Sequence, residues 1–129
     1  MASFTEPNYL DDILHWEGNK DYSREVVTLA APSGTPTYLK GTVLGIKTAD
    51  SKFYPATDGT SDGLQNAVAI LLADTTTNTT GVNALVLRRH AIILAPGLVW
   101  DATYTTQAKK DAAIAALKAL GIITKSQVY

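Results

Sequence analysis

The sequence predicts an α+β protein that is mostly β and carries one helix near its C-terminus. Short runs rich in β-branched residues alternate with turn-forming clusters through most of the chain, which is typical of short strands joined by turns. A single alanine-rich run with helical periodicity follows these strands. The chain has 129 residues, which corresponds to one domain that is large enough to bury a hydrophobic core.

Seven runs predict the strands. The first begins at Arg24, is rich in valine, and is followed by a turn cluster of proline, serine and glycine. Residues 67–73 form the longest apolar run, which is typical of a strand buried on both faces. Pro55 lacks a backbone N–H, so the run that it ends belongs at the edge or end of a ladder. The predicted strands are residues 24–30, 41–48, 52–55, 67–73, 82–87, 91–94 and 122–124.

One helix is expected over residues 107–120. Thr105 or Thr106 can cap it, because a threonine hydroxyl accepts a hydrogen bond from the free N–H groups of the first turn. Gly121 is expected to end the helix in a left-handed conformation, which glycine adopts without steric cost. The expected apolar stripe consists of Ala113, Ile114, Leu117 and Leu120.

The first 21 residues differ from the rest of the chain. Residues 1–25 carry six acidic and two basic side chains, whereas residues 76–129 carry six basic and two acidic ones. Since residues 1–21 lack strand alternation, we expect them to form a flexible arm that does not join the core by itself, with residues 22–129 as one domain. Ile13, Leu14 and Trp16 lie close together, as in an anchor. A short helix over residues 11–16, packed on the domain, remains an alternative.

Composition argues against several classes of function. The net charge is −1, so a protein that binds nucleic acid through a basic excess is not expected. The absence of cysteine removes disulfides, thiolate nucleophiles and cysteine-based metal sites. The longest apolar run has seven residues, whereas a membrane-spanning helix needs about 20. The first residues also lack a basic region followed by an apolar run, so we expect a protein made and retained in the cytoplasm.

Individual motifs do not indicate catalysis either. Residues 58–63 resemble part of a calcium loop, but no acidic residue follows at the required spacing, and a plain turn explains them. No local motif ties a serine or an acid to His90, and His15 is the one other histidine. Arg88 and Arg89 should point to opposite faces of a strand, which places one of them at the surface as an ion-pair partner. We therefore expect no enzyme, no metal and no cofactor.

An ordered set of segments covers the chain from about residue 16 to residue 124. The set consists of residues 22–31, 41–45, 62–63 and 67–71, then Arg88, Ala91 and Trp100, and finally residues 112–122. In this order the segments resemble the head decoration protein D family of lambda-like tailed phages. No single segment is specific, so the resemblance rests on their order. The chain departs from the pattern at His90, where we expect many members to carry an acidic residue, and this leaves the role of Arg88–His90 open.

The resemblance implies a phage head decoration protein with a β-clip-like core of bent β-ribbons. Such a protein binds the major capsid protein on the outside of the expanded capsid as homotrimers at three-fold and quasi-three-fold positions, and it stabilises the shell against the pressure of packaged DNA. The resemblance also implies that the N-terminal arm adds a strand to the capsid protein, without direct contact to nucleic acid or membrane. The capsid-binding residues expected in the arm are Ile13, Leu14, Trp16 and Tyr22.

Two other functions remain open. A free-standing β-rich module that binds carbohydrate or a cell surface would need a groove lined with exposed aromatic side chains, and the aromatic residues of this chain are few and scattered in sequence. A trimeric β-clip enzyme acting on nucleotides is suggested by fold analogy alone. It would need an aspartate-bearing motif for metal and phosphate, which the sequence does not show.

Overall fold

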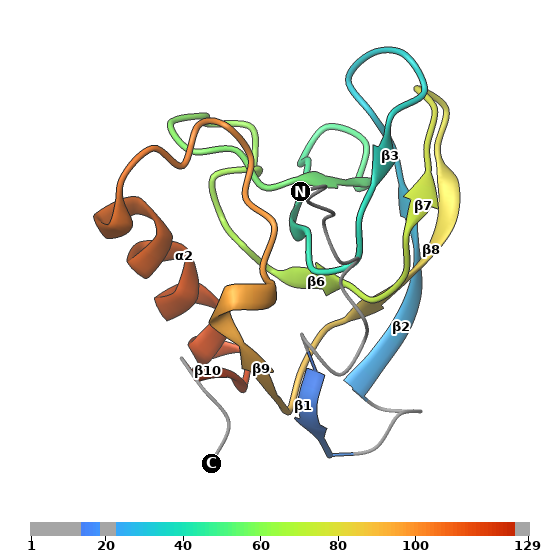
Figure 1. Cartoon of the computed structure of the whole chain (residues 1–129). Coiled ribbons are helices and arrows are strands. Elements are labelled where there is room, and N and C mark those ends of the chain that lie inside the picture. The colour runs from blue at the N-terminus through green and yellow to red at the C-terminus, as the bar shows by residue number, and fades with distance from the viewer. Residues whose placement is uncertain (1–13, 19–22, 126–129) are drawn as a thin grey trace, which may run out of the picture.

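The computed structural model describes residues 14–18 and 23–125. These residues form short strands, one α-helix and one short 3₁₀ helix (Figure 1). In chain order the elements are β1 (Leu14–Glu17), β2 (Arg24–Leu29), β3 (Thr37–Tyr38), β4 (Val43–Ile46), β5 (Phe53–Pro55), β6 (Ala69–Leu71), β7 (Thr75–Thr76), β8 (Val82–Leu87), β9 (Ala91–Leu94), η2 (Ala95–Gly97), α2 (Gln107–Ala119) and β10 (Ile122–Lys125). The mostly-β α+β class predicted from the sequence is confirmed.

Five strands close into a barrel in the order β2-β5-β4-β6-β8. Its longest ladder is the antiparallel pair β2 and β8, which runs from Arg24 opposite Leu87 to Leu29 opposite Val82. Along β2 the side chains alternate, with Val27 and Leu29 buried as the period of two in a strand requires. The bent-ribbon, β-clip-like core implied by the resemblance stays an expectation, whereas the closed barrel is what the strand pairing defines.

The remaining strands form two smaller sheets. The terminal sheet, as we name it, has the order β1-β9-β10, in which β1 is antiparallel and β10 parallel to β9. A parallel pair needs a long crossover, and α2 lies within the connection from β9 to β10 (Figure 1). The third sheet, β3 with β7, has two residues in each strand, and the side-chain hydroxyls of Thr37 and Thr76 share a hydrogen bond of 2.8 Å.

Two hydrophobic clusters explain why β6 is apolar throughout. Ala69 and Leu71 belong to the cluster inside the barrel, while Ile70 belongs to the cluster between the barrel, the terminal sheet and α2. All three side chains are buried, so the prediction of a strand buried on both faces is confirmed. The second cluster also contains Ala113 and Leu117 of α2, and it therefore joins the helix to the strands.

The helix agrees with its prediction at both ends, but of the expected apolar stripe only Ala113 and Leu117 are buried, while Leu120 is 37% exposed. Thr106 is the N-cap, and its hydroxyl accepts a hydrogen bond from the Lys109 N–H at 3.4 Å. The helix ends at Ala119, one residue earlier than expected, and Leu120 follows as the C-cap. Gly121 has a φ of +85°, so the left-handed stop is confirmed. All seven predicted strands form: β2, β4, β5 and β6 are shorter than expected, β8 and β9 have the expected bounds, and β10 is one residue longer, whereas β1, β3 and β7 were not predicted.

The expectation for residues 1–21 needs a correction where the structure describes them. Leu14–Glu17 form β1 and pair with β9, so this part of the segment joins the core of its own chain. The helix considered over residues 11–16 is not present at residues 14–16, which are strand. The strand has only four residues, Leu-His-Trp-Glu, too few for their alternation to predict a strand, and its register shifts between Leu14 and Trp16. Residues 1–13 and 19–22 lie outside the described residues.

The stop at Gly121 gives a stability prediction. We expect Gly121→Val to lower the free energy of unfolding by about 1–2 kcal/mol through its left-handed backbone alone. A Cβ there would also lie 3.3 Å from the His90 backbone nitrogen, which adds a steric cost. Gly34→Val is the control, because Gly34 has a φ of +69° and a Cβ at that position would meet no atom within 4 Å. Thermal and urea unfolding of both variants should show the larger loss for Gly121→Val; an unchanged midpoint would contradict the assigned stop.

Candidate functional site

The first candidate site is β1, which carries the part of the predicted anchor that the structure describes. Its two ends lie opposite Ile93 and Ala91 of β9. Directly after the strand, the Gly18 N–H donates a hydrogen bond of 2.8 Å to the His90 carbonyl oxygen. Among residues 14–18 and 23–125, β1 stands first in the order of the terminal sheet, so it is an edge strand there, and edge strands are the usual templates for pairing with another chain.

An ion pair ties the end of β1 to the start of β2. The Arg24 guanidinium donates from Nε to Glu17 Oε2 at 2.9 Å and from Nη2 to Glu17 Oε1 at 2.8 Å. This two-bond geometry is the strongest form of a pair between arginine and a carboxylate. Both side chains are mostly covered, at 24% and 18% exposed, so solvent screens the pair less than it screens a pair on the open surface.

The shift in register separates the two predicted anchor residues onto opposite faces. Leu14 lies opposite Ile93, and a regular antiparallel ladder would then place Trp16 opposite Ala91 on the same face. Instead, Trp16 lies opposite Ile92. Because neighbouring strand residues point to opposite faces, Leu14 packs against the core cluster while the Trp16 side chain is 54% exposed. Of the remaining predicted residues, Ile13 and Tyr22 lie outside the described residues.

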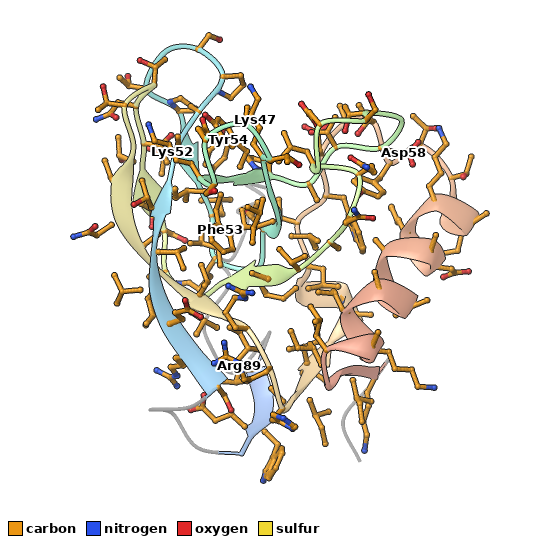
Figure 2. All side chains as sticks on the ribbon, turned by 180° about the vertical axis from the view of Figure 1, so that it is seen from behind. Lys47, Lys52, Phe53, Tyr54, Asp58 and Arg89 are labelled. Carbon is orange, nitrogen blue, oxygen red and sulfur yellow. The ribbon has the colours of Figure 1, made fainter. Side chains whose placement is uncertain are left out.

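The turn between β8 and β9 brings together three residues whose role the sequence left open. Arg88 and Arg89 both reach one carboxylate oxygen, Glu25 Oε2, at 3.5 Å and 3.1 Å. Both arginines lie beyond β8, which ends at Leu87, so the expectation that they point to opposite faces of a strand was wrong, and both of them, rather than one, form an ion pair. The Arg88 guanidinium also lies 5.2 Å from the centre of the Phe53 ring. Figure 2 shows Arg89 near the start of β2, away from the labelled groove residues Lys47 and Tyr54.

His90 contributes through its backbone. It has a φ of +50°, which turns the chain between β8 and β9. Its carbonyl oxygen accepts hydrogen bonds from the Gly18 N–H and from the Ser23 hydroxyl, at 2.8 Å and 3.2 Å. No sequence pattern indicates this role, because it belongs to a backbone carbonyl and not to the side chain.

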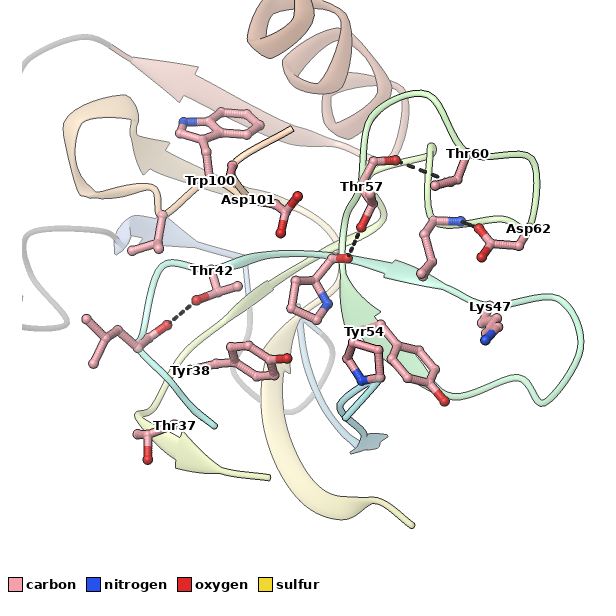
Figure 3. Close-up of a pocket in the computed structure, with 16 residues that line it drawn as sticks. Thr37, Tyr38, Thr42, Lys47, Tyr54, Thr57, Thr60, Asp62, Trp100 and Asp101 are labelled. Carbon is pink, nitrogen blue, oxygen red and sulfur yellow. Dashed lines mark hydrogen bonds between the residues drawn. The ribbon is translucent and has the colours of Figure 1, made fainter. Parts of the chain in front are cut away.

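A groove of about 610 Å³ is the second candidate site (Figure 3). Three aromatic residues that are far apart in sequence, Tyr38, Tyr54 and Trp100, line it. Tyr54 is only 7% exposed, and its hydroxyl donates a hydrogen bond to Asp50 Oδ2 at 2.8 Å. Trp100 packs against Tyr104 with their ring centres 5.0 Å apart. The rings therefore come together, but much of their surface is already in contact with the protein.

The acidic side chains at this groove accept hydrogen bonds from residues near them in sequence. Two acidic side chains line it, Asp62 and Asp101, together with the single basic side chain of Lys47. The Leu64 N–H lowers the pKa of Asp62, with a further contribution from Thr60. Burial raises the pKa of Tyr38, and the charge of Asp101 raises it further. Asp101 Oδ2 accepts hydrogen bonds from the backbone N–H and the hydroxyl of Thr103, so this carboxylate is oriented by its own loop.

The two acidic side chains in the turn over residues 58–63 form hydrogen bonds and an ion pair within the protein. Asp62 Oδ1 accepts a hydrogen bond from the Leu64 N–H at 3.2 Å, and Asp58 forms an ion pair of 3.2 Å with Lys109 of α2. Within residues 14–18 and 23–125, no three histidine or acidic side chains gather in a way that suits a metal ion. No helix in this part of the chain is long and apolar enough to span a bilayer.

The hydrogen bond between Tyr54 and Asp50 predicts a pH dependence. The Lys52 N–H, followed by the Tyr54 hydroxyl, lowers the pKa of Asp50 below its ordinary 3.8. The stability that Asp50 contributes is therefore present above that value and is lost as the pH falls through the folded-state pKa. We expect Asp50→Asn to lose less stability than the native chain between about pH 5 and pH 2. Denaturant unfolding across that range measures this, and parallel curves would contradict it.

The same pair predicts a second titration in the alkaline range. The hydrogen bond to Asp50 raises the pKa of Tyr54 above its ordinary 10.0, and burial contributes further. A raised tyrosine pKa adds stability that is present below pH 10.0 and lost as the pH rises through the folded-state value. In Asp50→Asn the near-ultraviolet phenolate signal assigned to Tyr54, by difference from Tyr54→Phe, should appear at lower pH than in the native chain.

Comparison with known proteins supplies the family. No curated protein matches the chain. The family model described as bacteriophage lambda head decoration protein D matches residues 3–122, which include the barrel, the terminal sheet up to the start of β10, and α2. A match over nearly the whole chain depends on the order of many segments, which agrees with the resemblance seen in the sequence. The chain therefore belongs to the bacteriophage lambda head decoration protein D family, whose members are structural components of the phage capsid.

Proposed function

We propose that this protein is a non-catalytic cement of the phage head. It binds the major capsid protein on the outer surface of the expanded capsid, as trimers at three-fold and quasi-three-fold positions, and is made in the cytoplasm of the host. The observation that carries the proposal is the family match over residues 3–122. The geometry supports it, because the described residues offer an edge strand and an exposed aromatic side chain next to the segment expected to bind the capsid.

In this proposal, strand addition is the means of binding. β1 is paired with β9 along one edge, and no strand of the described part of the chain pairs with its other edge. The arm adds a strand to the capsid protein when an extended capsid segment pairs along this edge of β1 and along the residues that precede it in the chain. Main-chain hydrogen bonds then provide affinity, and alternate side chains provide selectivity. Three such contacts in a trimer act together, so that each arm binds only weakly but the whole trimer is held firmly.

Stabilisation of the shell then follows from mass action. A ligand that binds the expanded shell, but not the unexpanded or broken shell, shifts the equilibrium toward the expanded form. The shift grows with the logarithm of ligand concentration over its dissociation constant, and it reaches about 2.7 kcal/mol for each site at a hundredfold excess. Many sites on one capsid together oppose the outward pressure of packaged DNA.

The proposed contacts in the arm are Ile13, Leu14, Trp16 and Tyr22. Among those that the structure describes, Trp16 has the geometry of a contact residue, since it is 54% exposed. Leu14 packs against the core cluster of its own chain and so contributes to binding by holding β1 in place. The groove at Tyr38 and Trp100 gives less support to a carbohydrate-binding module, because Tyr54 is buried and Trp100 is stacked on Tyr104.

Two deletions test the role of the arm. A protein without residues 1–12 keeps every described residue, so we expect it to fold with a melting temperature near that of the native chain. We expect this protein to bind expanded heads at least about tenfold more weakly, because the extended segment that pairs with the capsid is shortened. Bound copies are measured by pelleting undecorated expanded heads with each protein over a range of concentrations.

A protein without residues 1–21 also loses β1, the Glu17–Arg24 ion pair and the packing of Leu14. It should therefore bind weakly and melt at a lower temperature than the shorter deletion. Unexpanded heads are the control for specificity. If the protein without residues 1–12 decorates heads as well as the native chain does, the first twelve residues do not bind the capsid.

Two substitutions in β1 separate binding from stability. Trp16→Ala removes an exposed ring, so we expect binding to heads to fall about tenfold with little change in melting temperature. Leu14→Ala removes a side chain that packs on the core, so we expect a loss of about 1–2 kcal/mol in the free energy of unfolding. Thermal unfolding and head pelleting of both variants test this pair. If Trp16→Ala lowered the stability and Leu14→Ala lowered only the binding, Trp16 would face the core and Leu14 would face outward, contrary to the structure.

A further inference from the structure

A row of apolar side chains crosses the outer face of the terminal sheet. Trp16 of β1 lies opposite Ile92 of β9, and Ile92 in turn lies opposite Ile123 of β10. Paired residues of neighbouring strands point to the same face of a sheet, so these three side chains are neighbours. We name them the apolar row. Figure 1 shows the three strands side by side at one end of the molecule.

The row is open to solvent although it is built from large apolar side chains. Trp16 is 54% exposed and Ile123 is 47% exposed, while Ile92 between them is half-buried. The opposite face of the same strands is covered, because Ile93 and Ile122 are fully buried in the cluster that includes Leu117 of α2. One face of the terminal sheet thus forms core, and the other presents a contiguous apolar surface.

A charged side chain lies on the same face as the row. Lys125 of β10 lies opposite Leu94, two residues beyond Ile123. Glu17, which accepts two hydrogen bonds from Arg24, lies opposite Ala91 and therefore on the core-facing side of the sheet. An apolar centre with a polar border is the usual composition of a protein–protein interface. The row itself consists of apolar side chains, so the surface that it fits is apolar.

We propose that the apolar row is a second contact with the capsid, made by the folded body and distinct from the arm. This inference rests on the proposed function and adds to it the residues and the chemical character of the contact. The partner is an apolar patch on the shell surface. The position of the arm favours this occupant, since residues 1–13 join the body at Leu14, at the beginning of the strand that carries Trp16. A capsid segment paired along β1 therefore lies next to the row.

Both contacts then share one sheet. The edge of β1 offers backbone hydrogen bonds, and the outer face of the same sheet offers apolar surface, so a shell that engages the first also covers the second. Trp16 belongs to the arm as well as to the row, and its substitution cannot separate them. Ile123 can, because it comes from the other end of the described chain and lies outside the segment 1–21.

The test replaces Ile123 either with a positively charged lysine or with a negatively charged glutamate. We expect Ile123→Lys and Ile123→Glu to bind expanded heads about tenfold more weakly than the native chain, and to a similar extent, because either charge would have to be desolvated against an apolar patch. Val26→Lys and Val26→Glu are the matched controls, since Val26 is an apolar strand residue on β2 that is 64% exposed. Thermal unfolding of all four variants identifies any loss of fold.

Each outcome decides the inference. Weaker binding by both Ile123 variants, with native sedimentation and with native-like binding by the Val26 variants, supports it. Weaker binding by only one of the two Ile123 variants would show that the shell surface at this position is charged, which overturns the inference. A changed oligomeric state would place the row between subunits of this protein, which also overturns it. Unchanged binding by both variants also overturns it. If the native chain itself fails to bind heads, the proposed function fails, and that result is distinct from all of these.

Discussion

The carbonyl group of His90 is the point on which the arrangement of β1, β2 and β9 depends. Its oxygen accepts one hydrogen bond from Gly18, just after β1, and one from Ser23, just before β2. The neighbouring Arg88 N–H donates to the Ser23 carbonyl, and the Ala91 N–H donates to the Gly121 carbonyl at the end of the helix. One tight turn between β8 and β9 thereby fixes the entry to the barrel, the edge of the terminal sheet and the stop of α2.

The barrel and the terminal sheet, which meet at this turn, differ in the regularity of their strand pairing. In the barrel, β2 and β8 form a long regular ladder in which each residue has a fixed partner. In the terminal sheet the ladder is short and shifts by one residue at β1. The shift has a cost in regular pairing, but it is what turns Trp16 outward while Leu14 remains in the core. The surface proposed for binding is thus produced by an irregularity, as is common where strands serve a function.

Sequence patterns predicted the elements whose signals are local. The helix has a cap, a periodic stripe and a glycine stop within one short segment, and the continuous apolar run at β6 indicated burial on both faces. β3 and β7 have two residues each, too few for a period to be visible. β1 was missed because its four residues are too few for a clear period, and the role of His90 because it is carried by a backbone carbonyl. Of the predicted capsid-binding residues, the exposure of Trp16 and the packing of Leu14 depend on partners in β9, which no local pattern reveals.

The topology of the terminal sheet has a consequence for the order of folding. Its outer strands come from opposite ends of the described chain, and both pair with β9. Contacts between segments that are distant in sequence form slowly, because closing the long loop between them lowers the chain entropy before the contact contributes any stabilisation. The β2–β8 ladder joins residues that are 53–63 positions apart and the β9–β10 pair joins residues 31 positions apart, whereas the β1–β9 pair joins residues 74–79 positions apart, so β1 is the last strand to be added. We therefore expect amide hydrogens in β1 to exchange with solvent ahead of those in the barrel, and a newly made chain to complete this edge of the terminal sheet only when the rest of the protein is already in place.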